Sequence, residues 1–192
     1  MQITEGSLTF SFNDRYTLIK FDNTLFYRKY FNGLPNAKGI DFIADSDKDV
    51  LMVEIKNYTG HEAQNRWRTL VDHRKMLLPI NEADESFDIE ISKKVAMTIS
   101  CLTGALTKSN VCEASNELLR YFSSITDKKI ITGKKKIKVI LFLDGNFEVR
   151  TRTNKMIMNR IQDSLKSKLA WLYCDVQVVN SYTVNKDYFQ VI

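Results

Sequence analysis

Short runs of apolar positions, separated by polar turns, mark the first forty residues. Residues 7–12 (SLTFSF) alternate polar and apolar positions, and residues 16–21 (YTLIKF) form a second run, so both predict β-strands. Asp22 could cap a short helix over residues 23–31. The Gly, Pro and Asn content of residues 32–39 predicts a loop after that helix.

Two longer apolar runs follow, GIDFIAD (39–45) and VLMVEIKNY (50–58), and the polar turn between them predicts a β-hairpin. Beyond the hairpin, the pattern predicts helices over 62–78, 90–106, 112–126 and 153–172, an acidic loop over 79–89, and strands over 137–143 and 174–180. Trp67, Leu70 and Leu77 recur at helical spacing in the first of these helices. This order of elements predicts an α/β fold with a mixed central sheet flanked by helices.

The hairpin separates its residues by chemistry. If the turn is residues 46–49, Asp45 pairs with Val50 and Asp41 lies opposite Glu54. Because side chains alternate between the faces of a strand, one face of the hairpin becomes wholly apolar and is predicted to be core. The apolar face holds Ile40, Phe42, Ala44, Leu51, Val53 and Ile55, and the other face holds Asp41, Ile43, Met52, Glu54 and Lys56.

Three charged side chains therefore share one face of an otherwise apolar hairpin. Directly opposed residues have Cβ atoms roughly 4.5–5.5 Å apart, so the carboxylates of Asp41 and Glu54 would repel each other. A divalent cation would compensate both charges, and hard oxygen ligands suit Mg²⁺ or Mn²⁺. Lys56 can reach the same point. The alternative is a plain salt bridge among these side chains on a solvated face.

The strings KGIDFIAD (38–45) and LMVEIKNY (51–58) resemble the D…(D/E)-x-K core of the PD-(D/E)XK nuclease superfamily. That superfamily includes restriction endonucleases, Holliday-junction resolvases and RecB-like nucleases. The resemblance implies a restriction endonuclease-like αβββαβ core, with a mixed sheet between helices. It implies that Asp41 and Glu54 bind Mg²⁺ or Mn²⁺, and that Lys56 positions or activates the attacking water.

The same resemblance adds two further site residues. Ile55, between the glutamate and the lysine of the motif, is included with the metal-binding positions. The stretch ISKKVAMTISCLTGA (91–105) resembles the lysine-containing helix of uncharacterised bacterial proteins with this motif, which makes Lys94 a catalytic candidate.

One departure from the family pattern concerns a third acid. Many members add a glutamate from the first helix, but residues 13–38 contain no glutamate. Asp14 and Asp22 are the acids that could take its place, although neither matches a motif. Other members of the superfamily also lack this group.

Composition and charge are consistent with this picture without proving it. A chain of 192 residues with 44% hydrophobic positions suits one domain, 1–192, since domains run to about 100–200 residues. The formal charge of +5 fits a polyanionic partner, but solubility alone also explains it. The basic residues that could line a phosphate-binding surface are Lys134, Lys135, Lys136, Arg150, Arg152, Lys155 and Arg160. A merely solvated face is the alternative.

Several other classes of protein fit the sequence poorly. The three cysteines form no CxxC pair, and two histidines are too few for a zinc protease or a catalytic triad. The chain shows neither a secretory signal pattern nor an apolar run of the ~20 residues that span a bilayer, so we expect no membrane association and a cytoplasmic location.

Three hypotheses follow. The first is a metal-dependent nuclease acting on DNA. The second is a catalytically weak or inactive module of the same fold that binds nucleic acid or a protein. The third is an interaction protein whose acidic loop, residues 82–90, docks a basic partner. A homodimer is an open possibility under each hypothesis.

Overall fold

A mixed five-stranded sheet forms the centre of the computed structural model, which describes residues 1–76 and 83–192. Across this sheet the strands are ordered β3 (Thr17–Lys20), β4 (Phe42–Asp45), β5 (Asp49–Asn57), β8 (Lys136–Asp144) and β9 (Cys174–Val179). The first three are antiparallel neighbours, and β5, β8 and β9 are parallel. The expected α/β architecture with a mixed central sheet is confirmed.

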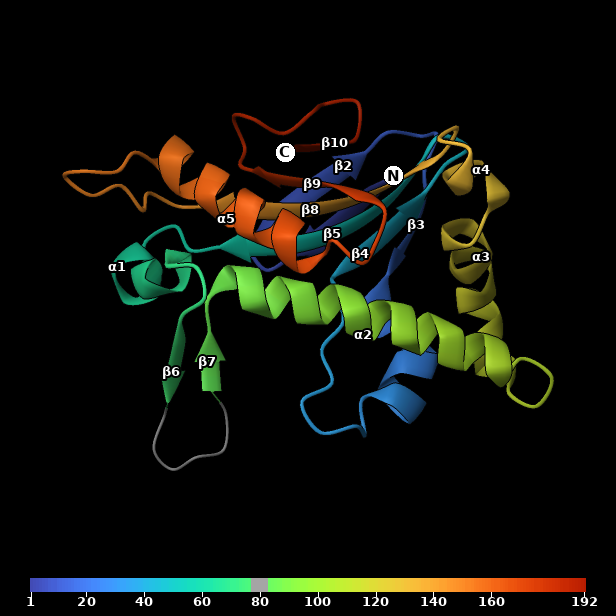
Figure 1. Cartoon of the computed structure of the whole chain (residues 1–192). Helices are drawn as coiled ribbons and strands as arrows, with labels where there is room; N and C mark the ends of the chain where they lie inside the picture. The colour runs from blue at the N-terminus through green and yellow to red at the C-terminus, as the bar shows by residue number, and fades with distance from the viewer. Residues whose placement is uncertain (77–82) are drawn as a thin grey trace.

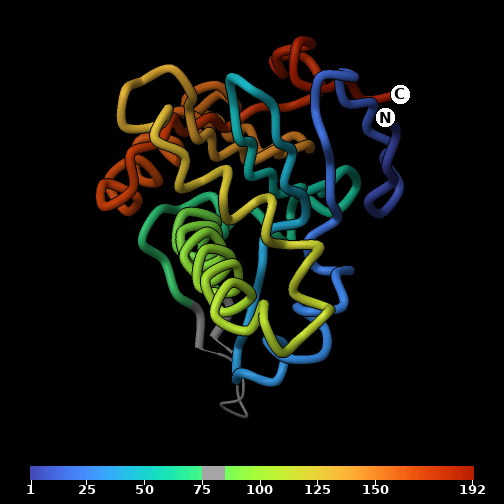
Figure 2. The backbone as a smooth tube through the Cα atoms, turned by 90° about the vertical axis from the view of Figure 1, so that its right-hand side faces the viewer, coloured from blue at the N-terminus to red at the C-terminus, as the bar shows by residue number. Residues whose placement is uncertain are grey.

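A second sheet covers one face of the first (Figure 1). Its strands are ordered β1 (Gln2–Glu5), β2 (Leu8–Phe12) and β10 (Phe189–Val191), so the two chain ends lie together (Figure 2). Phe10, Phe12 and Phe189 from this sheet pack against Phe42 and Phe142 of the central sheet. One face is thus covered by strands, a feature that the sequence pattern did not predict.

Helices cover the opposite face. The long ones are α2 (Phe87–Thr107), α3 (Asn116–Ile125) and α5 (Asn154–Lys168), and the short ones are α1 (Glu62–Asn65), α4 (Lys128–Ile131), the 3₁₀ turns η1 (Phe21–Asn23), η3 (Arg66–Thr69) and η4 (Glu113–Ser115), and the π-helix η2 (Tyr27–Phe31). A small hairpin, β6 (Arg74–Met76) with β7 (Ala83–Glu85), precedes α2. Among the described residues, no helix has both the length and the apolar character needed to cross a membrane.

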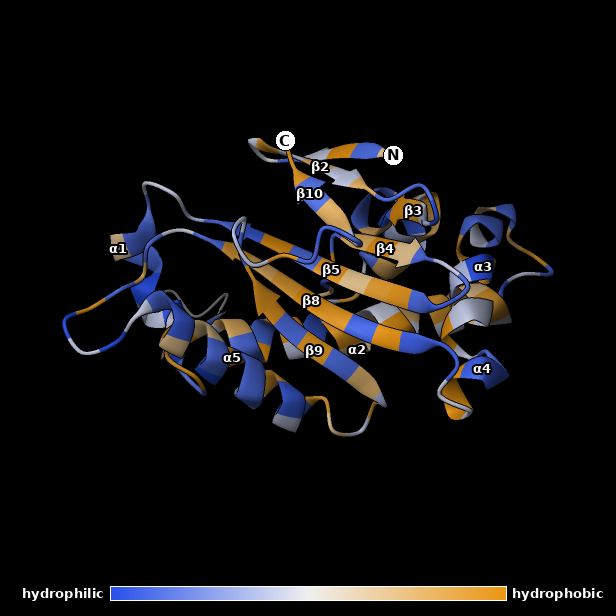
Figure 3. Cartoon of the chain, turned by 90° about the horizontal axis from the view of Figure 1, so that it is seen from above, coloured by the Kyte–Doolittle hydropathy of each residue, from blue (hydrophilic) through white to orange (hydrophobic). Residues whose placement is uncertain are grey.

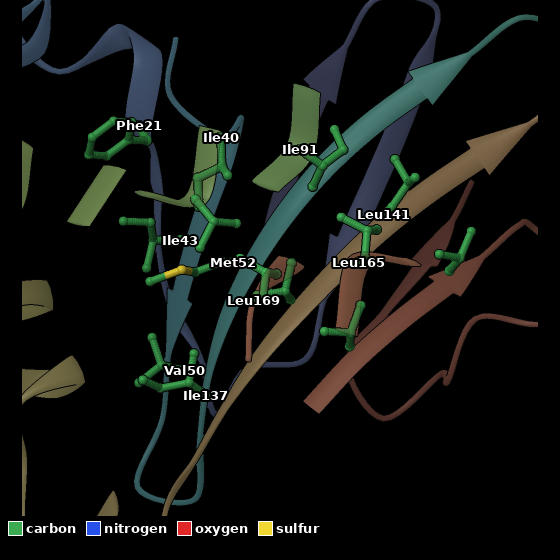
Figure 4. Packing of buried hydrophobic residues seen from close by; sticks show 14 of the residues in the cluster. Phe21, Ile40, Ile43, Val50, Met52, Ile91, Ile137, Leu141, Leu165 and Leu169 are labelled. Atoms are coloured by element: carbon green, nitrogen blue, oxygen red, sulfur yellow. The ribbon is translucent and has the colours of Figure 1, made fainter. Parts of the chain in front are cut away.

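The main core lies between the central sheet and these helices. In Figure 4, Ile43 lies beside Met52 and Val50 beside Ile137, and the same cluster includes Leu141 of β8, Ile91 of α2 and Leu165 of α5. Strands β5, β8 and β9 are apolar along most of their length, and polar residues line the outer side of α5 (Figure 3). Strands β5 and β8 are buried between two layers, which explains why their sequences are nearly continuous apolar runs. Strand β9 lies at the edge of the sheet and includes Asp175 and Gln177.

The hairpin register agrees with the prediction. Asp45 pairs with Val50 and Phe42 with Val53, so the faces of β4 and β5 separate as expected. Both faces are core, because the second sheet covers one and the helices cover the other. The prediction that Ile40 shares a face with Phe42 and Ala44 is wrong. Ile40 precedes β4 in an irregular segment and packs on the helix side of the sheet.

The prediction of a helix over residues 62–78 is wrong beyond Thr69, where the helical structure ends. It consists of α1 and η3, and the chain then turns through Asp72, whose φ of 59° breaks a right-handed helix. The turn is held from outside, since Asp72 N–H donates to Asp88 Oδ2 at 3.1 Å. Leu77 lies outside the described residues, as does part of the expected loop 79–89; of the rest, 83–85 is strand and 87–89 is helix.

The first helical segment also differs from its prediction. Asp22 lies inside η1, and Thr24 provides the cap, because its Oγ1 accepts from Tyr27 N–H at 3.4 Å. The expected helices 90–106 and 112–126 are present as α2 and as η4 with α3, while the one expected over 153–172 ends at Lys168.

Lys135, expected on a phosphate-binding surface, is buried at the turn end of the hairpin. Its Nζ donates to Asp45 Oδ1 at 2.7 Å and to Ser124 Oγ at 2.5 Å, and Arg120 Nε lies 3.3 Å from Asp45 Oδ2. This cluster ties β4 to α3 and to the start of β8. Lys135 therefore stabilises the fold and is not available to a nucleic acid.

We expect Lys135→Ala to lower the free energy of unfolding by about 3 kcal/mol, because Asp45 would lose its buried counterion. The value lies at the low end for a broken buried pair, since Arg120 and Ser124 remain. The matched control is the exposed neighbour, Lys134→Ala, which should change stability by less than about 0.5 kcal/mol. Urea denaturation measures both, and equal losses would contradict the structural role of Lys135.

Candidate functional site

The predicted acids converge beside the start of β4. Asp41 precedes the strand, and its Oδ2 accepts the main-chain N–H of Ile55 at 2.6 Å. Its carboxylate thus continues the hydrogen bonding between the strands one residue beyond β4. The side chain of Ile55 packs in the opposite cluster, so only its main chain can take part in a site with Asp41.

Glu54 is the most deeply buried member of the cluster, with 1% of its side chain exposed. Its Oε1 lies 2.5 Å from Lys94 Nζ and 3.0 Å from Lys56 Nζ. Lys94 comes from α2 and also lies 4.0 Å from Asp41 Oδ1. The structure therefore brings together all four residues that the sequence singled out as catalytic: Asp41, Glu54, Lys56 and Lys94.

Two further charged residues complete the cluster, and sequence reasoning missed both. Glu90 Oε1 accepts from Lys56 Nζ at 3.0 Å, and its Oε2 accepts from the guanidinium of Arg68. Glu90 stands one helical turn before Lys94 on α2, which is a spacing that the sequence displayed. Arg68 lies on η3, and nothing in its local sequence pointed to this contact.

The environment raises the pKa of Asp41 to about 7. Burial is the main cause, because it penalises the charged carboxylate, and the negative charge of Glu54 acts in the same direction. Lys94 and the N–H of Ile55 oppose the shift without cancelling it. A proton or a cation on Asp41 would relieve this unfavourable burial of charge.

The neighbouring ion pair holds its charges firmly. Burial alone would lower the pKa of Lys56, but Glu54 and Glu90 outweigh it and raise that pKa. Burial alone would raise the pKa of Glu90, whereas Lys56 and Arg68 bring it below its usual range. Lys56 is therefore a fixed ammonium donor at neutral pH.

One buried carboxylate oxygen of the cluster has no hydrogen-bond partner among the described residues. Glu54 Oε2 is buried without a hydrogen-bond partner, and a buried carboxylate oxygen normally has one. Within residues 1–76 and 83–192, no group of three or more His, Cys, Asp or Glu side chains is arranged to hold a metal. Any cation held here would have Asp41, Glu54 and the main chain of Ile55 as its protein ligands and would need water for its other ligands, so a metal at this site stays a prediction.

The two candidates for a third acid lie in different places. Asp14 is fully exposed and pairs with the N-terminal amine, so it is remote from the cluster. Asp22 lies on η1, which the N–H of Phe21 fixes to the carbonyl of Asp41 at 2.8 Å. One oxygen of Asp22 is buried without a partner, and burial raises its pKa. Asp22 therefore borders the site.

Gly39 permits this close approach of η1. A Cβ atom at position 39 would lie 2.5 Å from the ring of Phe21. Any side chain there would displace Phe21, and with it the main-chain contact between Phe21 and Asp41.

The predicted basic residues divide between the two ends of the sheet. Lys134 and Lys136 are exposed at the start of β8, beside the hairpin turn. In the register of the two strands, Lys136 lies opposite Asp49 of β5. Lys56 is seven residues further along β5 than Asp49, which is a distance of about 23 Å along the strand. Lys134 and Lys136 therefore do not join the site. The exposed residues that follow β8, at the same end as Lys56, are Arg150, Arg152, Lys155 and Arg160.

The acidic loop expected over 82–90 is largely not a surface loop. Glu85 pairs with Lys93 at 2.5 Å, Asp88 accepts from Ser86 and Ser164, and Glu90 belongs to the buried cluster. Residue 82 lies outside the described residues. Glu85, Asp88 and Glu90 thus serve internal contacts, and docking of a basic partner to this segment stays a prediction.

A family model described as a family of unknown function, DUF6661, matches residues 24–192. The chain belongs to this family. No curated protein and no solved structure matches the chain. The matched region contains the whole charged cluster and the helices that carry it, whereas β1, β2 and β3 precede it.

The raised pKa of Asp41 predicts how stability depends on pH without divalent cations. Between about pH 4 and 7, folded Asp41 keeps a proton that the unfolded chain has released, so its contribution to stability is lost as the pH rises through 7. Asp41→Asn removes this titration. The free energy of unfolding of the variant, measured relative to that of wild type, should therefore rise by about 2–3 kcal/mol from pH 5 to pH 8.

Urea unfolding in EDTA at both pH values measures this difference. Asp47→Asn, at an exposed position of the hairpin turn, is the matched control and should follow wild type. Parallel pH curves for wild type and Asp41→Asn would show that Asp41 has an ordinary pKa.

Proposed function

We propose that this chain is a metal-dependent nuclease of the PD-(D/E)XK type that hydrolyses phosphodiester bonds, with DNA as the expected substrate. The observation that carries the proposal is the convergence of Asp41, Glu54 and Lys56, together with a buried oxygen of Glu54 that has no partner. Paired carboxylates and an ammonium on one strand face are the groups that such hydrolysis requires.

The arrangement of elements supports the proposed restriction endonuclease-like core. Strands β3, β4 and β5 are antiparallel neighbours, α2 follows, and β8 adds in parallel to β5. This is the βββαβ part of the expected αβββαβ order. The helical segment of residues 21–31 lies between the first two of these strands, whereas the expected core places a helix before them.

Each residue has a distinct part in the proposed reaction. Asp41 and Glu54, with the main chain of Ile55, would hold Mg²⁺ or Mn²⁺. The bound cation would polarise the scissile phosphate and make water more acidic. Lys56, fixed by Glu54 and Glu90, orients water and stabilises charge that develops on the phosphate. Lys94 neutralises Glu54 from the side of α2.

Glu90 acts in this proposal through Lys56. It holds the ammonium from the side opposite to Glu54, and Arg68 in turn fixes Glu90. A group held by two carboxylates loses less freedom on reaching the transition state, which is the benefit of preorganisation. Glu90 is therefore a positioning residue.

A nucleic-acid-binding module without catalysis is the second candidate, and the charge balance of the cluster favours it. Asp41, Glu54 and Glu90 are matched by Lys56, Lys94 and Arg68, so the charges can cancel without a bound cation. Lys94 also occupies one oxygen of Glu54, where a metal would otherwise have free access.

A nuclease assay distinguishes the two candidates. Purified protein is incubated with plasmid, single-stranded, branched DNA and RNA in Mg²⁺, Mn²⁺ or EDTA. We expect cleavage that EDTA abolishes, and we expect Lys56→Met to lower its rate by about 10²–10³, the usual effect of removing one donor to developing charge. Retention of Mn²⁺ binding by the variant in calorimetry would assign Lys56 to the reaction rather than to the metal.

Lys56→Met leaves two carboxylates with fewer partners, so thermal unfolding must accompany the assay. Lys138→Met is the matched control, since Lys138 is a partly buried lysine on β8 that pairs with Asp49 away from the cluster. It should alter stability and leave cleavage per folded molecule unchanged. No cleavage by wild type on any of these substrates would favour the binding module.

Glu90→Gln tests the positioning role separately. We expect kcat to fall by at least about tenfold while KM changes little, because Lys56 remains but loses one of its two holds. Glu90→Asp, which retains the charge, should recover part of the loss. Equal kcat for wild type and Glu90→Gln would show that Glu54 alone is sufficient to position Lys56.

A further inference from the structure

A groove opens beside the cluster, between η3, the segment that follows β8, and the first turns of α5. Its cavity volume is about 90 Å³, and the groove is open to solvent. Its lining consists of Arg66, Thr69, Leu70, Phe147, Val149, Arg152, Met156, Ile157 and Arg160. Enclosed sites for small organic groups begin at roughly 300 Å³, so a ligand would lie along the open groove and not inside an enclosed pocket.

Three arginines give this groove its charge. Arg66, Arg152 and Arg160 are exposed, and among the described residues none of their guanidinium groups forms an ion pair or a side-chain hydrogen bond. Among the described residues, no acidic side chain contributes to the lining. Guanidinium groups bind phosphate in a bidentate manner, and unpaired ones carry no cost of breaking an internal pair.

Apolar side chains give the groove its second property. Leu70, Val149 and Met156 retain 41%, 38% and 56% of their surface, although they lie side by side in the lining. Phe147 and Ile157 are buried behind them. A grouped set of exposed apolar side chains with a charged rim is typical of a binding site.

The groove lies at the end of the sheet where the charged cluster is found. Both the segment after β8 and α1, which leads into η3, extend from this end, opposite to α4 (Figures 1 and 3). The ring of Phe147 in the groove lies edge-to-face with that of Tyr58, with centroids 6.2 Å apart, and the hydroxyl of Tyr58 accepts from Arg68 at 2.8 Å. Arg68 binds Glu90, the partner of Lys56.

We infer that this groove binds one unpaired nucleotide of a single-stranded nucleic acid, with its base on the apolar side chains and the flanking phosphates on the three arginines. The choice of nucleic acid rests on the proposed function. A duplex would offer phosphates to the arginines, but its bases are stacked inside and would leave the apolar side chains uncovered. A single strand satisfies both halves of the groove.

Fluorescence anisotropy of a labelled dT₁₂ oligonucleotide, in EDTA so that no cleavage occurs, tests this inference. We expect the Arg66→Ala/Arg152→Ala/Arg160→Ala variant to bind at least about thirtyfold more weakly. Its dependence of log K on log salt should be shallower by about two, since each phosphate contact to a single strand contributes about 0.7. Met156→Glu should weaken binding about tenfold, because a carboxylate in place of the apolar side chain would no longer pack on the base and would repel the phosphates.

The control variant removes three exposed lysines from the opposite end of the sheet, Lys48→Ala/Lys128→Ala/Lys129→Ala. It has the same net charge as the arginine variant and should bind dT₁₂ within about twofold of wild type. Equal weakening in the two variants would show that only total charge matters, and would overturn the inference. Tighter binding of a 12-base-pair duplex than of dT₁₂ would overturn it as well.

Polyglutamate distinguishes a protein partner from a nucleic acid. If polyglutamate displaces dT₁₂ at equal charge concentration, the groove does not distinguish carboxylates from nucleotides, and the inference fails. Its failure is separable from failure of the proposed function. Groove-dependent binding without any cleavage would leave the inference standing on a binding module, and cleavage that the arginine variant retains at unchanged KM would refute the groove alone.

Discussion

Glu54 is the constraint on which the rest of this structure depends. A carboxylate with 1% of its side chain exposed is costly to bury unless charged partners meet it. Lys94 of α2 and Lys56 of the same strand supply those partners. The requirement fixes the position of α2 along the sheet, because any shift of the helix by a turn would leave Glu54 and Lys94 buried without each other.

The hairpin has a second buried ion pair at its other end, and the two ends differ in whether their carboxylates are fully hydrogen-bonded. Asp45 is satisfied by Lys135, Ser124 and Arg120, which come from the surrounding elements. At the site end, Glu54 keeps one oxygen without a partner and Asp41 has a raised pKa. Saturated contacts stabilise a fold, whereas unsatisfied ones leave free energy that a ligand can recover.

The cluster and the arginine-lined groove together account for the charge distribution at one end of the molecule. In the cluster, each ammonium or guanidinium lies against a carboxylate, so it is nearly neutral overall. The described lining of the groove contains three arginines and no acid. Under the proposed function, the groove would attract and hold the polyanion while the cluster acts on it. The contacts from Phe147 through Tyr58 and Arg68 place the two next to each other.

The hairpin and its charged face could be derived from the sequence because both depend on short-range geometry. Strand alternation and a four-residue turn were enough to set Asp45 against Val50 and to bring Asp41 beside Glu54. Lys94 was found by resemblance of its helix. Most of α2, α3, β8 and β9 followed from apolar runs long enough to have one interpretation.

Only the tertiary structure decided the remaining features, because they depend on residues far apart in the chain. Strands β1 and β10 exist by pairing with β2 from opposite ends of the sequence. The pattern after residue 69 suggested more helix, but contacts with the start of α2 impose a turn at Asp72. In the sequence, Glu90 and Lys135 resemble ordinary surface charges. In the structure both are buried, Glu90 against Lys56, 34 residues away, and Lys135 against Asp45, 90 residues away. Local periodicity fixes which face of an element is apolar, whereas the partner of a charge is set by the packing of whole elements.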